Sequence, residues 1–333
     1  MPYGKSVKAP RCRAIISQTE AKTSPRKSDE ASFHPVEFPS EGATLRGVLY
    51  VPVGRTRHAP AVVMAHGFSA TIRGMVADKY AEIFQAAGFT VLLYDHRNFG
   101  ASDGTPRQEI NRWVQARGYR DAMNFLEGRE EVDADRIAIW GDSASAAETL
   151  VVGAVDPRVR AVIAQVPACG DEPPPDDADG SRFAKLKTTL IHGNVLSVPG
   201  NTVGPLPVVS SDQLRAPSLL TPLTAFRWFI EYGGRFGTLW ENWATVGRPA
   251  ASVPFHPGLC APHLKAPLLM MVAPSDEMPG ASDSISRMVF DLVGGPKQFA
   301  EVDGGHFGLL YHPGQVFDQA AQRQRSFLEE QLL

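Results

Sequence analysis

The sequence of 333 residues lacks the features that mark several large classes of protein. Its three cysteines, Cys12, Cys169 and Cys260, are an odd number at wide spacing, with no Cys-x-x-Cys pair and no histidine at zinc-ligand spacing. No apolar run is long enough to span a membrane, and no apolar segment near the start resembles a secretory signal. We therefore expect a cytoplasmic protein in a reducing compartment, with no membrane partner and no metal.

The chain also lacks a strong net charge, which is -3 at pH 7 and offers no attractive field for nucleic acid. Residues 1–30 are an exception, with seven Lys and Arg residues against three acidic residues. A basic, acid-poor leader of this kind is typical of a disordered tail, and an organelle transit peptide is the alternative. The hydrophobic fraction of 43% is sufficient for a packed core in the remainder.

The apolar pattern after the tail predicts a mostly parallel, doubly wound α/β sheet. Two short β-rich runs, 33–38 and 44–51, predict an antiparallel opening pair. Apolar strands then alternate with amphipathic helices, as in parallel sheets that are covered on both faces. The expected strands are 61–65, 90–94, 136–140, 161–166, 267–272 and 297–302. The expected helices are 76–87, 112–126, 144–155, 282–292 and 317–332.

The alternation stops between 170 and 264, which predicts an inserted lid or cap between the sixth and seventh strands. The insertion opens with a Pro- and Asp-rich linker, 171–180, which cannot continue a strand or a helix. The core domain would then comprise 31–169 and 265–333. Aromatic residues in the insertion can fix it onto the core or line a substrate pocket. The candidates for the pocket are Trp228, Phe229, Tyr232 and Trp240.

The stretch GDSAS at 141–145 stands directly after an expected strand and directly before an expected helix. A tight strand-to-helix turn with small residues two before and two after a serine is the pattern of a nucleophile elbow. Gly141 and Ser145 fill the two small positions, although glycine is commoner than serine in the second. Ser143 is therefore the candidate nucleophile. Simple capping of the helix by this serine is the bland alternative, and Asp142 as nucleophile would place a tryptophan in the first small position.

A serine hydroxyl needs a histidine base to react near neutral pH, and the histidine needs a carboxylate to hold its tautomer. In one recurring chain order the acid follows a late strand and the histidine comes last. Asp276 follows the strand expected at 267–272, with the adjacent Glu277 as the alternative. His306 lies in a Gly-Gly-His-Phe loop after the last expected strand. The order predicts a Ser143–Asp276–His306 triad.

An acyl-transfer site also needs backbone N–H donors for the oxyanion. The amide of Ala144, directly after the nucleophile, is one candidate. The amide of Phe68 is the other, because Gly67 lets the backbone after the third strand turn into the site. His66 is expected to fix this loop. No glycine-rich phosphate loop follows the first parallel strand, so no nucleotide or other cofactor is expected.

These motifs together resemble the α/β-hydrolase superfamily: His-Gly-Phe at 66–68, DHRNFGASDG at 95–104, GDSAS at 141–145, Asp-Glu-Met-Pro at 276–279 and Gly-Gly-His-Phe at 304–307. The resemblance implies the α/β-hydrolase fold from residue 33 onward. The stretches 131–137 and 151–156 are similar to the bacterial and fungal polyketide transferases and thiohydrolases. Those relatives often carry Tyr or Phe and then Ser-Gly-Gly after the nucleophile, whereas this chain has Ala144, Ser145 and Ala146.

The triad and the resemblance together predict a serine hydrolase that cleaves a carboxylic ester or thioester of a small-molecule acyl substrate through an acyl-enzyme on Ser143. One alternative is an acyltransferase that passes a polyketide-like acyl group to an alcohol or amine. An alternative of another class is a catalytically inert, hydrolase-like binding protein. The sequence leaves the oligomeric state open, a homo-dimer included.

Overall fold

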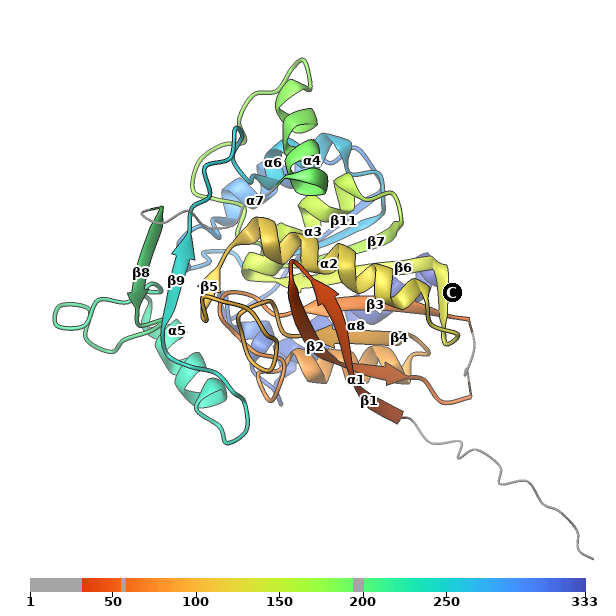
Figure 1. Cartoon of the computed structure of the whole chain (residues 1–333), viewed down its shortest axis with the longest axis horizontal. Coiled ribbons are helices and arrows are strands. Elements are labelled where there is room, and N and C mark those ends of the chain that lie inside the picture. The colour runs from red at the N-terminus through yellow and green to blue at the C-terminus, as the bar shows by residue number, and fades with distance from the viewer. Residues whose placement is uncertain (1–31, 55–57, 194–200) are drawn as a thin grey trace, which may run out of the picture.

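The computed structural model describes residues 32–54, 58–193 and 201–333 (Figure 1). The segment 1–30, predicted to be a disordered tail, lies outside the described residues. Of the three cysteines, Cys169 and Cys260 are described, and both are buried free thiols. No helix in the described ranges is long and apolar enough to cross a membrane.

An eight-stranded sheet forms the centre of the molecule. Its strands in chain order are β1 (Ser32–Ser40), β2 (Ala43–Val51), β3 (Ala59–Ala65), β4 (Thr90–Tyr94), β6 (Val132–Asp142), β7 (Val159–Gln165), β10 (Leu268–Val272) and β11 (Lys297–Glu301). Their spatial order is β1-β2-β4-β3-β6-β7-β10-β11, with β1 and β2 antiparallel and the six strands from β4 to β11 parallel. The predicted mostly parallel sheet with an antiparallel opening pair is confirmed.

Helices cover both faces of this sheet because the strands are apolar on both sides. One face packs against α1 (Ala77–Ala86) and α8 (Gln315–Leu332), and the other against α2 (Arg112–Glu127), α3 (Ser143–Val155) and α7 (Asp283–Leu292). Successive strand residues alternate between the two cores, as period-2 geometry requires. In β3, for example, Met64 belongs to the core under α1 and Val63 to the core under α2.

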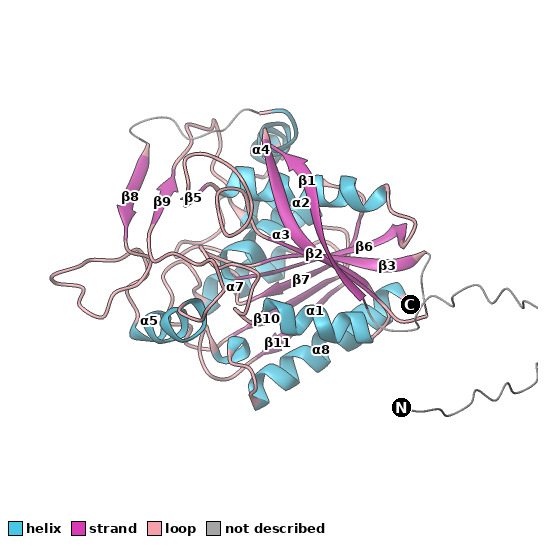
Figure 2. Cartoon of the chain, turned by 60° about the horizontal axis from the view of Figure 1, so that its bottom comes forward, coloured by secondary structure: helices cyan, strands magenta, loops and turns pink. Residues whose placement is uncertain are grey.

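The chain between β7 and β10 carries further elements. They are α4 (Ser181–His192), β8 (Thr202–Leu206), α5 (Leu223–Trp228), a π-helical turn (Phe229–Gly233), β9 (Ala244–Gly247), α6 (Pro257–Cys260) and a 3₁₀ turn (Ala261–His263). Strands β8 and β9 join β5 (Glu109–Ile110) from the core in a second, three-stranded sheet, which Figure 2 shows beside the main one. Helices α4 and α6 instead contact the core helices α2 and α3. The insertion is thus anchored to the core at two places.

The parallel strands bring distant loops together at one edge of the sheet. The carboxyl ends of β3, β6, β10 and β11 all lie at this edge, because these strands run in the same direction. Ligand sites in open α/β sheets form outside the carboxyl ends of the strands. The loops that carry the candidate residues therefore meet there.

Candidate active site

A strained turn presents Ser143 between β6 and α3. Ser143 has a φ of 53°, a left-handed conformation that L-residues rarely adopt. A Cβ on Gly141 would lie 2.5 Å from both the backbone carbon and the carbonyl oxygen of Ser145, so only glycine fits there. The first turn of α3 packs this closely against the end of β6 because the chain reverses within two residues. The backbone has the geometry expected of a nucleophile elbow.

Three side chains from separate loops form a continuous hydrogen-bonded chain. His306 Nε2 lies 2.9 Å from Ser143 Oγ, and His306 Nδ1 lies 2.7 Å from Asp276 Oδ2. The other carboxylate oxygen of Asp276 accepts the backbone N–H of Met278 at 2.9 Å, which fixes the carboxylate. The His306 side chain is 2% exposed, so water cannot displace these bonds. The structure brings together the three residues of the predicted triad.

Glu277, the alternative acid, has a different place. Its Oε2 accepts the backbone N–H of His306 at 3.0 Å, so Glu277 holds the loop that carries the histidine. This bond reaches the backbone of His306 and not its imidazole ring. Burial favours the neutral carboxyl, but hydrogen bonds from Thr224 and the His306 N–H outweigh it and lower the pKa of Glu277. Asp276 is therefore the residue placed to hold the imidazole tautomer.

The loop after β3 lies against the elbow. A Cβ on Gly67 would lie 2.8 Å from the Asp142 carbonyl oxygen and 3.0 Å from Ser143 Cβ, so glycine permits this approach. Phe68 and Ala144 both line a cavity with Ser143. The Phe68 amide has no acceptor among the described residues, and the Ala144 amide is in the first turn of α3, where helical N–H groups have no intrahelical partner. These are the two amides predicted for the oxyanion.

A buried ion pair holds that loop. His66 Nδ1 lies 3.0 Å from Asp142 Oδ1, and His66 Nε2 contacts the carbonyl of Met75. Burial disfavours the charged imidazole, but the charge and hydrogen bond of Asp142 outweigh burial and raise the pKa of His66. The same carboxylate accepts the Gly67 N–H at 2.9 Å. Asp142 is thus engaged with the loop after β3, which leaves Ser143 as the residue that faces His306.

The serine at 145 closes a polar cluster beneath the elbow. Its hydroxyl donates to the carbonyl of His66 at 2.8 Å, His96 Nε2 lies 2.8 Å from it, and Glu148 Oε2 lies 3.1 Å from it. Burial lowers the pKa of His96 to about 3 and raises the pKa of Glu148 to about 8. Both groups are then neutral at pH 7 and both can donate to Ser145. Ser145, which stands where glycine is commoner, therefore links three buried polar groups by hydrogen bonds.

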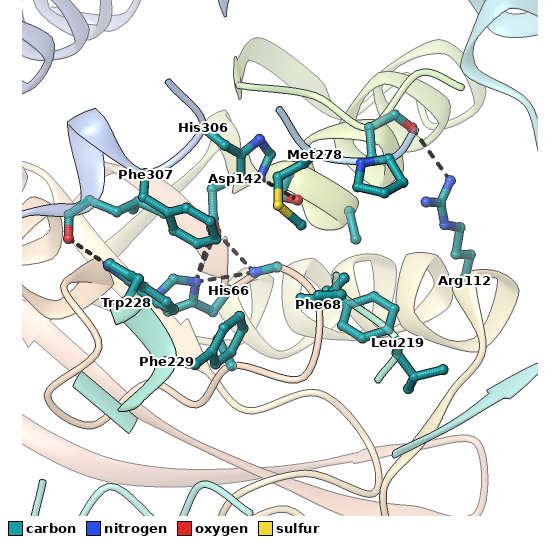
Figure 3. A pocket seen from close by; sticks show the side chains of 18 residues that line it. His66, Phe68, Arg112, Asp142, Leu219, Trp228, Phe229, Met278, His306 and Phe307 are labelled. Carbon is teal, nitrogen blue, oxygen red and sulfur yellow. Dashed lines mark hydrogen bonds and ion pairs between the residues drawn. The ribbon is translucent and has the colours of Figure 1, made fainter. Parts of the chain in front are cut away.

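A cavity of about 170 Å³ opens beside Ser143 (Figure 3). Trp228 and Phe229 line it as predicted, and Trp228 Nε1 donates to the carbonyl of Leu310 at 2.9 Å. Tyr232 and Trp240 do not line it, so the prediction for these two residues is corrected. The π-helical turn puts Tyr232 behind Trp228, with ring centroids 5.5 Å apart, and Trp240 stacks behind Phe229 at 5.3 Å.

Other lining residues were not predicted. They are mainly apolar and include Ala70, Leu219, Leu220, Met278, Phe307 and Leu310, together with the cationic Arg112. The two leucines come from a stretch without helical or strand periodicity, so no pattern pointed to them. Arg112 could have been suspected, because it begins a helix directly after a loop at the active edge. In the three described ranges no cluster of three or more His, Cys, Asp or Glu side chains could hold a metal ion.

Comparison with known proteins agrees with this geometry. Residues 60–191 match a family model described as alpha/beta hydrolase fold. An α/β hydrolase from Penicillium sp. sh18 superposes with a TM-score of 0.65 at 25% identity, over 90% of this chain and 99% of that one. The structure of DcsB with its substrate analogue gives a TM-score of 0.66 at 22% identity, with the same coverage. The α/β-hydrolase fold is therefore confirmed.

Sequence relatives narrow the class. A polyketide transferase of Aspergillus fumigatus is 32% identical over 302 residues, covering 89% of this chain and 98% of that protein. Thiohydrolases of Arthrinium phaeospermum and Aspergillus aculeatus are 44% and 40% identical over 134 and 143 residues, which is 40% and 43% of this chain. These two matches span only 42% and 44% of the thiohydrolases. The chain belongs to the α/β-hydrolase family that includes these polyketide transferases and thiohydrolases, as its motifs predicted.

Proposed function

We propose that this protein is a serine hydrolase that cleaves a thioester or carboxylic ester through an acyl-enzyme on Ser143. The observation that carries the proposal is the unbroken chain from Ser143 Oγ through His306 to Asp276, beside a largely apolar cavity. The relatives named thiohydrolase favour a thioester as the bond that is broken. A serine that only caps a helix needs neither a buried imidazole beside it nor a strained backbone turn.

The proposed reaction has two halves. His306 Nε2 accepts the proton of Ser143 Oγ while that oxygen attacks the acyl carbon, and Asp276 accepts a hydrogen bond from His306 Nδ1–H throughout. The bond from the acyl carbon to the leaving sulfur or oxygen then breaks, and the imidazolium returns its proton to the leaving group. Water, deprotonated by the same imidazole, then attacks the acyl carbon. The bond from that carbon to Ser143 Oγ breaks, the imidazolium returns its proton to Ser143 Oγ, and the acid is released.

Two backbone amides, of Phe68 and Ala144, are proposed to bind the oxyanion of each tetrahedral intermediate. Their positions follow from the close approach of Gly67 to the elbow and from the start of α3. Because the amides are fixed before substrate arrives, they need no reorganisation during the reaction. The stretch from β8 to β9 is proposed to act as a lid, since it supplies Leu219, Leu220, Trp228 and Phe229 to the cavity wall.

A second candidate is acyl transfer to an alcohol or amine. Relatives named polyketide transferase and acyltransferase favour it. The chemistry of the first half-reaction is unchanged, and a bound acceptor replaces water in the second. Products analysed with and without a candidate acceptor distinguish the two reactions.

The test combines turnover with active-site labelling. A series of acyl thioesters of N-acetylcysteamine and of p-nitrophenyl esters is incubated with the wild type, Ser143→Ala and Ser181→Ala, an exposed serine at the start of α4 as matched control. We expect Ser143→Ala to lose turnover by at least about 10³-fold with an unchanged unfolding temperature, and Ser181→Ala to behave as wild type. Full activity of Ser143→Ala, or fluorophosphonate labelling at another residue, would reject the assignment.

A further inference from the structure

An arginine side chain lines the mainly apolar cavity beside Ser143. Arg112, the first residue of α2, is half-buried and lines the cavity (Figure 3). Its only hydrogen bond within the described chain is from Nη1 to the carbonyl of Ala168, and that bond is 3.5 Å long. A bond of this length is at the limit of what counts as a hydrogen bond. Most of the donor capacity of the guanidinium is therefore unused.

No carboxylate compensates this charge. Among the described residues no Asp or Glu oxygen lies within ion-pair distance of Arg112. Glu148 is an acidic residue whose carboxyl interacts electrostatically with Arg112. The positive charge of Arg112 lowers the pKa of Glu148, but burial outweighs it and raises this pKa to about 8, so the carboxyl is neutral at pH 7. Asp142, which also lines the cavity, is paired with His66. A partly desolvated, unpaired guanidinium costs free energy that a bound anion would offset.

Ala168 lies between the guanidinium of Arg112 and the backbone of Ser143. The N–H of Ala168 donates to the carbonyl of Ser143 at 2.9 Å, and the carbonyl of Ala168 faces Arg112. Arg112 and Ser143 therefore contact opposite ends of the same peptide residue. A group bound by Arg112 would be separated from the reacting carbonyl by a short carbon chain.

We infer that Arg112 selects acyl substrates that carry a carboxylate a few carbons from the scissile carbonyl. The guanidinium would hold the carboxylate as a bidentate pair, and the side chains of Leu219, Trp228 and Phe229 would cover the carbon chain between the two ends. The proposal rests on the proposed acyl-enzyme at Ser143 and adds the substrate class. A purely aliphatic acyl chain would leave the guanidinium without a partner.

The test compares paired substrates that differ only in charge. N-acetylcysteamine monothioesters of adipic, pimelic and suberic acid are compared with their neutral methyl esters, and the released thiol is measured. We expect the wild type to have the higher kcat/KM for one of the acids, and Arg112→Met to lower the acid-to-ester ratio about 10- to 100-fold. Arg112→Lys keeps the positive charge but loses the bidentate geometry of the guanidinium. Its acid-to-ester ratio should therefore lie between those of the wild type and Arg112→Met. The matched control Arg160→Met, an exposed residue of β7, should leave the ratio unchanged.

Separate outcomes overturn the two proposals. If Ser143 is labelled and turns over thioesters but Arg112→Met leaves the ratio unchanged, the inference about Arg112 is wrong and the acyl-enzyme stands. If no thioester is cleaved, the inference about Arg112 is tested by ligand binding. Titration calorimetry of Ser143→Ala with monomethyl adipate and dimethyl adipate needs neither turnover nor a variant at residue 112. Preferential binding of the mono-acid supports the inference, and equal or absent binding of both overturns it.

Discussion

Glu148→Gln should remove a pH-dependent loss of stability. Glu148 is a fully buried carboxyl in α3, and its Oε2 lies 3.1 Å from Ser145 Oγ beneath the nucleophile elbow. Burial raises its pKa from an ordinary 4.5 to about 8. Between these two pH values the folded protein keeps a proton that the unfolded chain has already released. The carboxyl therefore contributes its full stability below about pH 4.5, and that contribution is lost as the pH rises to about 8.

The pKa interval corresponds to a free energy of unfolding on the order of 5 kcal/mol, spread over the whole range. A glutamine in this place has no proton to lose, and its amide can donate to Ser145 Oγ as the protonated carboxyl does. We therefore expect wild type and Glu148→Gln to be similarly stable near pH 5. The variant should become the more stable protein by several kcal/mol at pH 9.

Guanidinium chloride unfolding, followed by the fluorescence of the five tryptophans, measures this difference at pH 5, 7 and 9. Comparing two variants at each pH cancels the titration of all other groups. Glu172→Gln, at an exposed position, is the matched control and should give a flat difference. A stability difference for Glu148→Gln that stays constant within about 0.5 kcal/mol from pH 5 to 9 would refute the reasoning.

Two further substitutions test the elbow. Gly141→Ala places a Cβ 2.5 Å from the backbone of Ser145, so the elbow must shift. We expect kcat to fall at least about 100-fold. The control Gly128→Ala, where the new Cβ meets no atom closer than 3.7 Å, should be active. Ser145→Ala leaves the His66 carbonyl, His96 Nε2 and Glu148 Oε2 without their shared partner and should cost about 2 to 4 kcal/mol in chemical denaturation. An active Gly141→Ala, or a Ser145→Ala as stable as wild type, would contradict the packing and the network respectively.

The main sheet and its helices could be predicted from the sequence because their patterns are long and unambiguous. All eight strands of the large sheet lie where apolar or alternating runs indicated them, and α2 begins at Arg112 as expected. The small sheet could not be predicted. Strand β5 has only two residues, Glu109 and Ile110, and they pair with Thr245 and Val246 of β9, 136 positions further along the chain. The local sequence pattern therefore contains no trace of this pairing.

The candidate site likewise has a part that the sequence predicts and a part that it does not. Ser143, Asp276 and His306 could be placed because each lies in the turn or loop that follows a recognisable strand, and a parallel sheet brings such loops together. The cavity wall depends on how the insertion folds back, and that is set by packing of one side chain on another. Aromatic content alone did not separate Trp228, which faces the cavity, from Tyr232, which lies one layer behind it.

The hydrogen bond between the Ser143 hydroxyl and His306 Nε2 joins residues 163 positions apart. During synthesis the elbow is made long before the two strands, β10 and β11, that position Asp276 and His306. A growing chain therefore carries Ser143 without its proposed base, His306, until β10 and β11 have emerged and joined the sheet. Under the proposed mechanism, hydrolytic competence would be acquired only when β10 and β11 have joined the sheet, so a chain terminated before them should be inert toward thioesters.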